Sequence, residues 1–168
     1  MNIIISASLA YDRIMDFSGH FKDHIMPDKI DILSVCFTID KLVEKRGGVA
    51  GNIAYTLKLL GENPKIVATV GGDFIAYKEC LENLGIDTSG IKVIEDDFTA
   101  SARIINDKIN NQITAFHPGA MNHSHQINLS DIISNGEDTI VLIGPDGKDA
   151  MLKRPAECKE LGVPYIFD

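Results

Sequence analysis

Tryptophan is absent from this chain, and only 7% of its 168 residues are aromatic. Cysteine is also scarce. Cys36, Cys80 and Cys158 lie far apart and form no C-x-x-C pair, which indicates reduced thiols in a cytosolic protein. No run of basic residues occurs, and 16 basic against 24 acidic side chains give a net charge of −8. We therefore expect no nucleic-acid partner and no membrane partner.

A long hydrophobic run is missing as well. The N-terminal stretch MNIIISASLAYD has neither a basic region nor a cleavage site, and its apolar part is too short for a signal peptide or a membrane span. Hydrophobic residues make up 45% of the chain and charged residues 24%, which is typical of a globular protein. These features predict a soluble, cytoplasmic protein that is one domain or part of a larger one.

Short apolar runs alternate with segments of helical periodicity, which predicts a parallel sheet covered by helices. Gly61 comes where a helix C-cap glycine belongs, and Asp73 is expected to be the N-cap of a further helix that Gly85 closes. The expected elements are strands at 3–9, 65–70, 139–143 and 163–167, helices at 49–60 and 74–84, a short helix at 129–135, and a helix at 147–161 interrupted at Pro155.

Two regions, about 15–45 and 98–117, interrupt this alternation and are expected to form a separate small sheet. In the first, residues 13–31 suggest a loop with a short helix, followed by a strand at 32–42. In the second, two strands at 99–105 and 112–116 are joined by the polar stretch NDKINN, which predicts a hairpin.

The last stretch, VPYIFD, has the pattern of a sheet strand, and no residue follows Asp168. Parallel strands are normally buried on both faces. An uncovered last strand therefore suggests that the 168 residues are a fragment of a longer domain.

The stretch RGGVAGN places three glycines, Gly47, Gly48 and Gly51, at the start of a predicted helix. Glycine allows positive φ and lets the backbone approach a ligand closely. Neither a P-loop nor a G-x-G-x-x-G pattern can be drawn through these residues. Two interpretations stay open from the pattern alone: a tight turn that leads into a helix, and a backbone surface that contacts a ligand.

Several stretches in order resemble the ribokinase-like (PfkB) family of carbohydrate and nucleoside kinases. They are SASLAYD, RGGVAGNIA, TVGGD, LGIDT and FHPGAM, which together span almost the whole chain. RGGVAGN and PGAM look most like bacterial adenosine-kinase-type members. The resemblance implies a three-layer α/β/α, Rossmann-like core with a small β-sheet lid, here incomplete at the C-terminus, and an acceptor bound between lid and core.

By resemblance, Asp12 grips the vicinal hydroxyls of the acceptor sugar, since a carboxylate accepts two charge-assisted hydrogen bonds from a cis-diol. Gly47 and Gly48 match the family's lid hinge, and Asn52 matches a residue that contacts a ring hydroxyl. The alternative for Asp12 is a solvated acid in a turn. With this resemblance, the glycines serve lid closure and close approach, and Asn52 serves sugar recognition.

Four further residues are weaker candidates for acceptor binding. Ser8 either contacts the acceptor or bonds to backbone as a buried strand serine. Phe116 either stacks on a base or packs between lid and core, and Cys36 and Phe37 are expected on the first lid strand, lining the same pocket. Adenosine-type relatives often carry a second aromatic residue on the opposing strand, where this chain has ASAR at 100–103. A different nucleoside or a sugar therefore remains an alternative acceptor.

The resemblance implies transfer of the ATP γ-phosphoryl group, with Mg²⁺, to a primary hydroxyl of adenosine or a sugar. The family's catalytic base lies in a D-T-x-G-A-G-D motif, and an N-x-x-E motif is linked to Mg²⁺. Neither motif occurs in the 168 residues. We therefore expect the acceptor half of a kinase, with no catalytic residue and no ATP or metal site of its own, and no activity alone. The alternatives are a ribokinase- or fructokinase-type sugar kinase, and a non-catalytic remnant that binds a ligand or dimerises through its lid sheet.

Two other groups of polar residues carry no predicted function. His117, His123 and His125 lie close in sequence, but no cysteine or carboxylate set with ligand spacing accompanies them, which favours a solvated loop over a metal site. Lys148 and the pair Lys153-Arg154 are expected on a solvated helix face.

Overall fold

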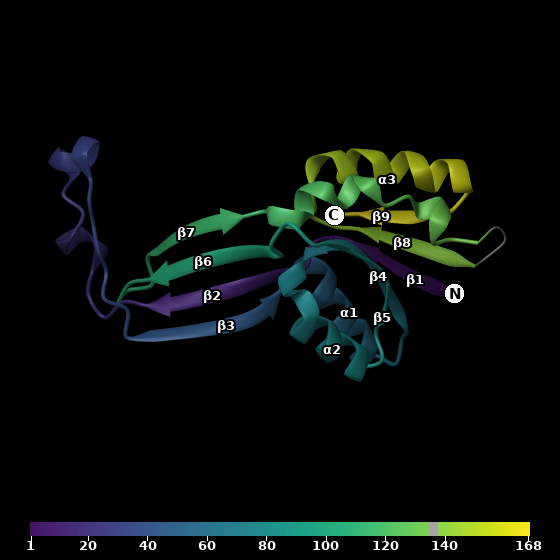
Figure 1. The fold of residues 1–168 in the computed structure, drawn as a ribbon, viewed down its shortest axis with the longest axis horizontal. Coiled ribbons are helices and arrows are strands. Elements are labelled where there is room, and N and C mark those ends of the chain that lie inside the picture. The colour runs from purple at the N-terminus through teal and green to yellow at the C-terminus, as the bar shows by residue number, and fades with distance from the viewer. Residues whose placement is uncertain (135–137) are drawn as a thin grey trace.

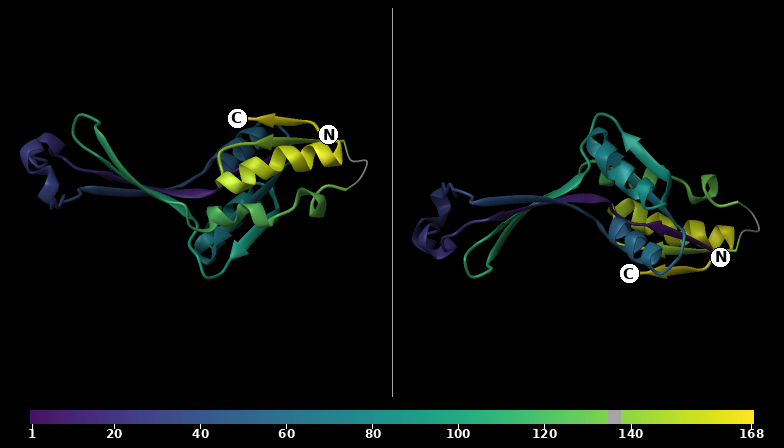
Figure 2. Two further views of the ribbon diagram at one scale, coloured as in Figure 1. Left: turned by 90° about the horizontal axis from the view of Figure 1, so that it is seen from above. Right: turned by 90° about the horizontal axis from the view of Figure 1, so that it is seen from below.

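The computed structural model describes residues 1–134 and 138–168, which contain two β-sheets (Figure 1). One sheet lies in a core between helices. The other forms a lid that projects from this core as a long arm (Figures 1 and 2).

The core sheet has five strands in the order β5-β4-β1-β8-β9, and every neighbouring pair is parallel. The central strand β1 is apolar on both faces, because Ile4 and Ile5 point to opposite sides and both are buried. The strands are β1 (Asn2–Ser6), β4 (Pro64–Gly71), β5 (Asp87–Ile94), β8 (Thr139–Ile143) and β9 (Tyr165–Phe167).

Helices cover both faces of the core sheet. Ile5 packs with Ala54 and Tyr77 on one face, whereas Ile4 packs with Cys158 on the other. The predicted three-layer α/β/α core is therefore confirmed. The first face is covered by α1 (Val49–Leu59) and α2 (Ile75–Asn83), and the second by α3 (Lys148–Leu161).

The lid sheet has four strands in the order β3-β2-β6-β7. Its two central strands, β2 and β6, are parallel, and each edge strand is antiparallel to its neighbour. The hairpin predicted between residues 99 and 116 is confirmed as β6 and β7. The strands are β2 (Ala10–Asp16), β3 (Lys41–Gly47), β6 (Ala100–Asn106) and β7 (Gln112–His117).

The segment between β2 and β3 lies at the end of the lid farthest from the core (Figure 1), and it contains an aromatic cluster. The ring of Phe37 packs against Phe17 at a centroid distance of 4.8 Å and against Phe21 at 5.2 Å. Asp107, in the turn of the β6–β7 hairpin, accepts a hydrogen bond from the backbone N–H of Phe21 at 3.2 Å. This contact ties the cluster to the hairpin. The segment contains two short 3₁₀ helices, Phe21–Asp23 and Pro27–Ile32.

The helix ends predicted at glycines are confirmed. Gly61, just after α1, has φ of 91°, and Gly85, just after α2, has φ of 73°, values that glycine adopts at low cost. The interruption predicted at Pro155 is wrong, because α3 continues through it. None of the described helices has the length and apolar character needed to cross a membrane.

Several strand predictions need correction. The run at 3–9 is not one strand, because the chain leaves the core sheet after Ser6 and enters the lid at Ala10. The strand predicted at 32–42 is wrong, since the lid strand is β3 and most of residues 33–40 have no regular structure. The core strand β5 was missed, because Gly90 and the polar residues around it break the apolar pattern.

Two helix predictions also differ from the structure. Asp73 does not cap α2. Its carboxylate instead accepts hydrogen bonds from the N–H (2.8 Å) and the hydroxyl (2.7 Å) of Thr99, at the start of the lid hairpin. The helix predicted at 129–135 is only a 3₁₀ turn at Leu129–Asp131, and residue 135 lies outside the described residues.

Candidate functional site

The topological switch point of the core sheet lies between β1 and β8. The chain passes from β1 to β4 and β5 on one side, then to β8 and β9 on the other. The segments that follow β1 and β8 are adjacent, because the N–H of Ser8 donates to the carbonyl of Pro145 at 3.0 Å. Ligands of open α/β sheets bind outside the carboxyl ends of the strands at such a point.

Ser8 joins the start of α1 to this edge of the sheet. Its carbonyl accepts a hydrogen bond from Ala50 N–H at 2.9 Å, and its hydroxyl accepts one from Val49 N–H at 3.4 Å. Gly48, the N-cap residue, has φ of 89°, and a side chain there would collide with the backbone of Leu9. The Ser8 hydroxyl therefore contacts helix backbone, one of the two roles that its sequence position left open.

Asp12 lies on β2, beside the junction of lid and core. Its carboxylate occupies the space next to Gly47, where any Cβ would collide with it. The carbonyl of Gly47 accepts a hydrogen bond from the hydroxyl of Tyr77 at 2.9 Å. Burial raises the pKa of the Tyr77 hydroxyl, which keeps it protonated as a donor. Glycine at position 47 thus allows the Asp12 carboxylate to lie against the hinge backbone. No local pattern of residues indicates that Tyr77 donates to this carbonyl.

A row of side chains crosses the lid sheet at the level of Asp12. The strand register pairs Asp12 with Lys45 on β3 and with Ala102 on β6, and it pairs Ala102 with Phe116 on β7. Paired residues share a face of a sheet, so these four side chains point to the same side. Phe116 is 53% exposed on this face. We call the face that carries Asp12 the inner face of the lid, and the opposite face, which carries Arg13, the outer face.

Three other predicted residues do not join this row. Phe37 belongs to the aromatic cluster at the far end of the lid, and the exposed Cys36 precedes it in the same irregular segment rather than on a strand. Asn52, in the first turns of α1, lines a cleft on the outer side together with Tyr11 and Arg13. Sequence spacing could not separate these positions, because it does not reveal how far the lid extends from the core.

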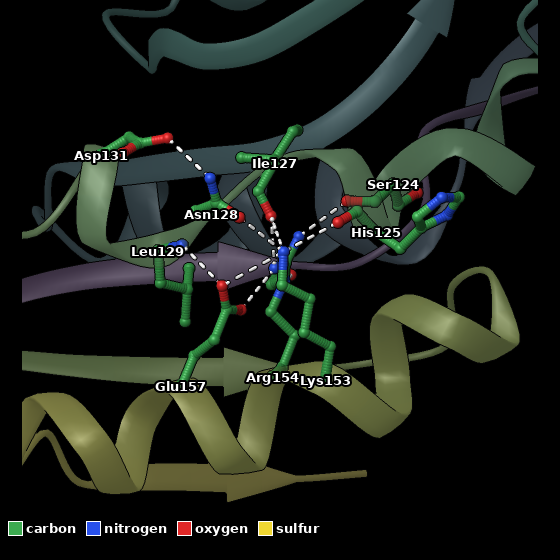
Figure 3. A network of polar contacts seen from close by, with 10 residues as sticks. Ser124, His125, Ile127, Asn128, Leu129, Asp131, Lys153, Arg154 and Glu157 are labelled. Atoms are coloured by element: carbon green, nitrogen blue, oxygen red, sulfur yellow. Dashed lines mark hydrogen bonds and ion pairs between the residues drawn. The ribbon is translucent and has the colours of Figure 1, made fainter.

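Arg154 on α3 is 1% exposed, so the prediction of a solvated helix face is wrong for this residue. Its guanidinium donates to the Ser6 hydroxyl (2.9 Å) and the Glu157 carboxylate (2.6 Å). It also donates to the carbonyls of Ile127 (2.8 Å) and Ser124 (2.9 Å) (Figure 3). Arg154 therefore ties the end of β1 to the loop that follows the lid. Helical periodicity cannot reveal such partners, because they come from distant segments.

Asp146 follows β8 at the carboxyl edge of the sheet, and the sequence interpretation missed it. Its Oδ1 accepts hydrogen bonds from the Ser124 hydroxyl (2.7 Å) and the Gly147 N–H (2.8 Å). Its Oδ2 is buried and has no hydrogen-bond partner among the described residues. Burial raises the pKa of this carboxyl, and the two hydrogen bonds offset part of that effect. The available signal was an acid directly after the predicted strand at 139–143.

Neither a cluster of metal ligands nor a P-loop is found among the described residues. No three His, Cys, Asp or Glu side chains within 1–134 and 138–168 lie together in a way that could hold a metal ion. The glycine-rich start of α1 lacks the Lys and Ser/Thr of a P-loop.

A three-layer core with a β-lid joined at two adjacent glycines, and an aspartate beside that joint, is the architecture of ribokinase-like kinases. The family model described as pfkB family carbohydrate kinase matches residues 24–167. The chain belongs to this family, whose kinases use ATP as phosphoryl donor.

Among curated proteins, the chain is similar to two archaeal nucleoside kinases. It is 42% identical to that of Methanocaldococcus jannaschii over 84 residues, which cover 49% of this chain and 28% of that protein. It is 36% identical to that of Methanothermobacter thermautotrophicus over 116 residues, which cover 67% of this chain and 38% of that protein. The chain thus matches well under half the length of these curated relatives.

Among solved structures, the chain is similar to the nucleoside kinase of Burkholderia thailandensis in complex with inosine. The two share 38% sequence identity and a TM-score of 0.81, and the match covers 99% of this chain and 52% of that one. The chain therefore spans about half the length of this neighbour.

Proposed function

We propose that this chain supplies the acceptor-binding side of an ATP-dependent kinase that phosphorylates a primary hydroxyl of a nucleoside. Membership of the carbohydrate kinase family supports the reaction class. The similar curated proteins are nucleoside kinases, and one similar solved structure contains inosine, which favours a nucleoside over a simple sugar.

The observation that carries the proposal is the inner-face row of Asp12, Ala102 and Phe116. Neighbouring strands are about 4.8 Å apart, so Asp12 and Phe116, two strands apart, are separated by about 10 Å. That span suits a carboxylate on the ribose diol and a ring on the base. Ala102 lies between them, and its small side chain leaves room for the nucleoside. The absence of a second aromatic residue at 100–103 is consistent with one stacking contact.

In this proposal Asp12 accepts hydrogen bonds from the 2′- and 3′-hydroxyls, and the backbone of Gly47 and Gly48 approaches the sugar closely. Closure of the lid about these glycines would exclude water from the acceptor hydroxyl. Tyr77 supports the hinge through its hydrogen bond to Gly47. Ser8 remains a proposed sugar contact, whereas Asn52 lines the cleft on the outer side of the lid and is not part of this arrangement.

The proposal further assigns no phosphoryl transfer to the 168 residues alone, because they contain no D-T-x-G-A-G-D motif to supply a base and an anion hole. Incubation of the purified chain with inosine, Mg²⁺ and ATP labelled at the γ-phosphate should give no labelled inosine monophosphate. Steady formation of product by a pure preparation would refute this part of the proposal, but it would not contradict the proposed acceptor site.

Calorimetric titration with inosine, adenosine and ribose tests the acceptor site. Asp12→Ala should weaken nucleoside binding about 100-fold or more, because hydrogen bonds to a charged group contribute about 1.5–3 kcal/mol each. Phe116→Ala should weaken nucleoside binding about 10-fold, since stacking on an aromatic ring contributes about 1–3 kcal/mol, and should leave ribose binding unchanged.

The matched control is Phe98→Ala, which removes an aromatic ring that is 67% exposed and lines a hollow on the outer side of the lid. This variant should bind inosine like the unmodified chain. Loss of affinity in Asp12→Ala but not in Phe116→Ala would point to a sugar acceptor, and undiminished inosine binding by both variants would overturn the proposal.

A further inference from the structure

The outer face of the lid gathers most of the chain's arginines. The sequence contains four, and one of them, Arg154, is buried under the core sheet. The other three, Arg13, Arg46 and Arg103, all lie on the outer face. Arg13 is paired in register with Arg103 on β6. Arg46 is paired with Tyr11, which is two residues from Arg13 on β2 and therefore points to the same side. In a chain of net charge −8, this concentration of guanidinium groups is a local exception.

These arginines line two adjoining hollows. The larger, about 660 Å³, lies where the lid meets α1 and α2, and it contains Arg13 and Arg46. The second, about 480 Å³, contains Arg13 and Arg103 together with His117. Arg13 therefore belongs to both hollows, which form one basic surface beside the hinge.

Two of the three guanidinium groups are free to take a ligand. Arg13 is paired with Glu44 at 2.8 Å. Among residues 1–134 and 138–168, the guanidinium groups of Arg46 and Arg103 make no hydrogen bond or ion pair. Asp73 is the other acid in the hollows, and its carboxylate accepts two hydrogen bonds from Thr99. The surface therefore keeps unpaired positive charge.

The larger hollow also contains three of the chain's four tyrosines, Tyr11, Tyr55 and Tyr77. Tyr55 is 47% exposed there, whereas Tyr11 and Tyr77 are buried in its wall. An exposed aromatic ring in the same hollow as the unpaired guanidinium of Arg46 suits a ligand that combines a planar ring with a phosphate, because arginine binds phosphate oxygens in a bidentate manner.

We propose that this outer surface binds a phosphate monoester, with Arg46 and Arg103 on the phosphate and Tyr55 beside the ring of a nucleoside monophosphate. The site is separate from the proposed acceptor site. Asp12 and Phe116 are on the inner face, with the thickness of the lid sheet between them and these arginines.

Titrations in the Asp12→Ala background isolate the outer site from the acceptor site. Calorimetry with AMP, inorganic phosphate and adenosine should show binding of the two phosphate compounds, with AMP the tighter, and none of adenosine. Arg46→Gln and Arg103→Gln should each weaken AMP binding about 10-fold, the loss of one charge-assisted contact. Because the chain has no tryptophan, its fluorescence comes from tyrosine. Binding of a phosphate compound should change this emission, which gives a second readout.

The matched control is Lys159→Gln, which removes one exposed positive charge from α3, away from the lid. It should bind AMP with unchanged affinity, and circular dichroism should show that all variants are folded. Equal AMP affinity in Arg46→Gln, Arg103→Gln and Lys159→Gln would overturn the proposal. Binding of inorganic phosphate as tight as that of AMP would assign the site to the free anion and remove the role of Tyr55.

Discussion

At the scale of single residues, the polar groups buried at the carboxyl edge of the sheet do most to join distant segments. Arg154 bonds to β1, to its own helix and to the loop after the lid. Asp146 and Ser124 continue this network toward the switch point. Each of these side chains satisfies groups that would otherwise be buried without a partner, which costs about 1–3 kcal/mol for each group.

Arg154→Met should therefore lower the free energy of unfolding by about 3–5 kcal/mol, because it removes four hydrogen bonds of a buried guanidinium, one of them to the Glu157 carboxylate. Glu157 itself keeps Lys153 and the Leu129 N–H as partners. Urea denaturation followed by circular dichroism measures the change. The matched control, Lys159→Met on the exposed last turn of the same helix, should change stability by less than about 0.5 kcal/mol. Equal effects of the two substitutions would show that the network contributes little.

At the scale of elements, the turn of the β6–β7 hairpin organises the distal part of the lid. Asp107 is 5% exposed, and its carboxylate accepts hydrogen bonds from the backbone of Phe21, Ile109 and Asn111 and from the Asn111 side chain. Burial alone would raise the pKa of this carboxyl, but these hydrogen bonds outweigh it and lower the pKa to about 2. The turn and the aromatic cluster are thus held together by one ionised group.

The stability of the lid should depend on this ionisation. The folded pKa lies below the value of about 3.9 in an unfolded chain, so the contribution is fully present above that value and is lost as pH falls toward 2. Asp107→Asn should lower stability at pH 6, and the difference from the unmodified chain should shrink steadily between about pH 4 and pH 2. Urea denaturation at a series of pH values measures this. A difference that stays constant over that range would contradict the assignment.

At the scale of the whole molecule, the lid carries an apolar row beyond its arginines. Leu42, Met15, Ile105 and Ile113 are paired in register across all four strands, on the outer face. Leu42 is 64% exposed and Ile113 is 39% exposed. An exposed apolar row of this kind favours association of the lid with another surface.

Dimerisation through the lid sheet, one of the alternatives from the sequence, remains a prediction, and this apolar row allows a test of it. Sedimentation equilibrium should report twice the monomer mass of 18.4 kDa. Leu42→Lys should return the chain to a monomer, since it places a charge in the apolar row. Leu59→Lys, at an equally exposed leucine on α1, is the control and should stay dimeric. A monomeric unmodified chain would rule out this assembly.

Much of the core and one hairpin of the lid could be predicted from the sequence. The strand at 139–143, the helix that starts at residue 49 and the hairpin within 99–116 follow from short-range signals: apolar runs, helical spacing and glycines after the last turn. Acceptor candidates such as Asp12 and Gly47 could be named from the pattern of glycines and the family resemblance. These features depend on residues close together in the sequence, so the sequence alone is enough to predict them.

The tertiary structure alone decided which candidates lie together. It brought Asp12, Ala102 and Phe116 into one row, because strand register aligns residues about 14 to 90 positions apart along the chain. In the folded chain Phe37 lies at the far end of the lid. Arg154 is buried, although helical periodicity predicted that it would be exposed to solvent. The sequence by itself determined most elements of the core and the family, because both depend on local patterns of residues. Register and burial depend on contacts between distant segments, so only the folded chain determined the two faces of the lid.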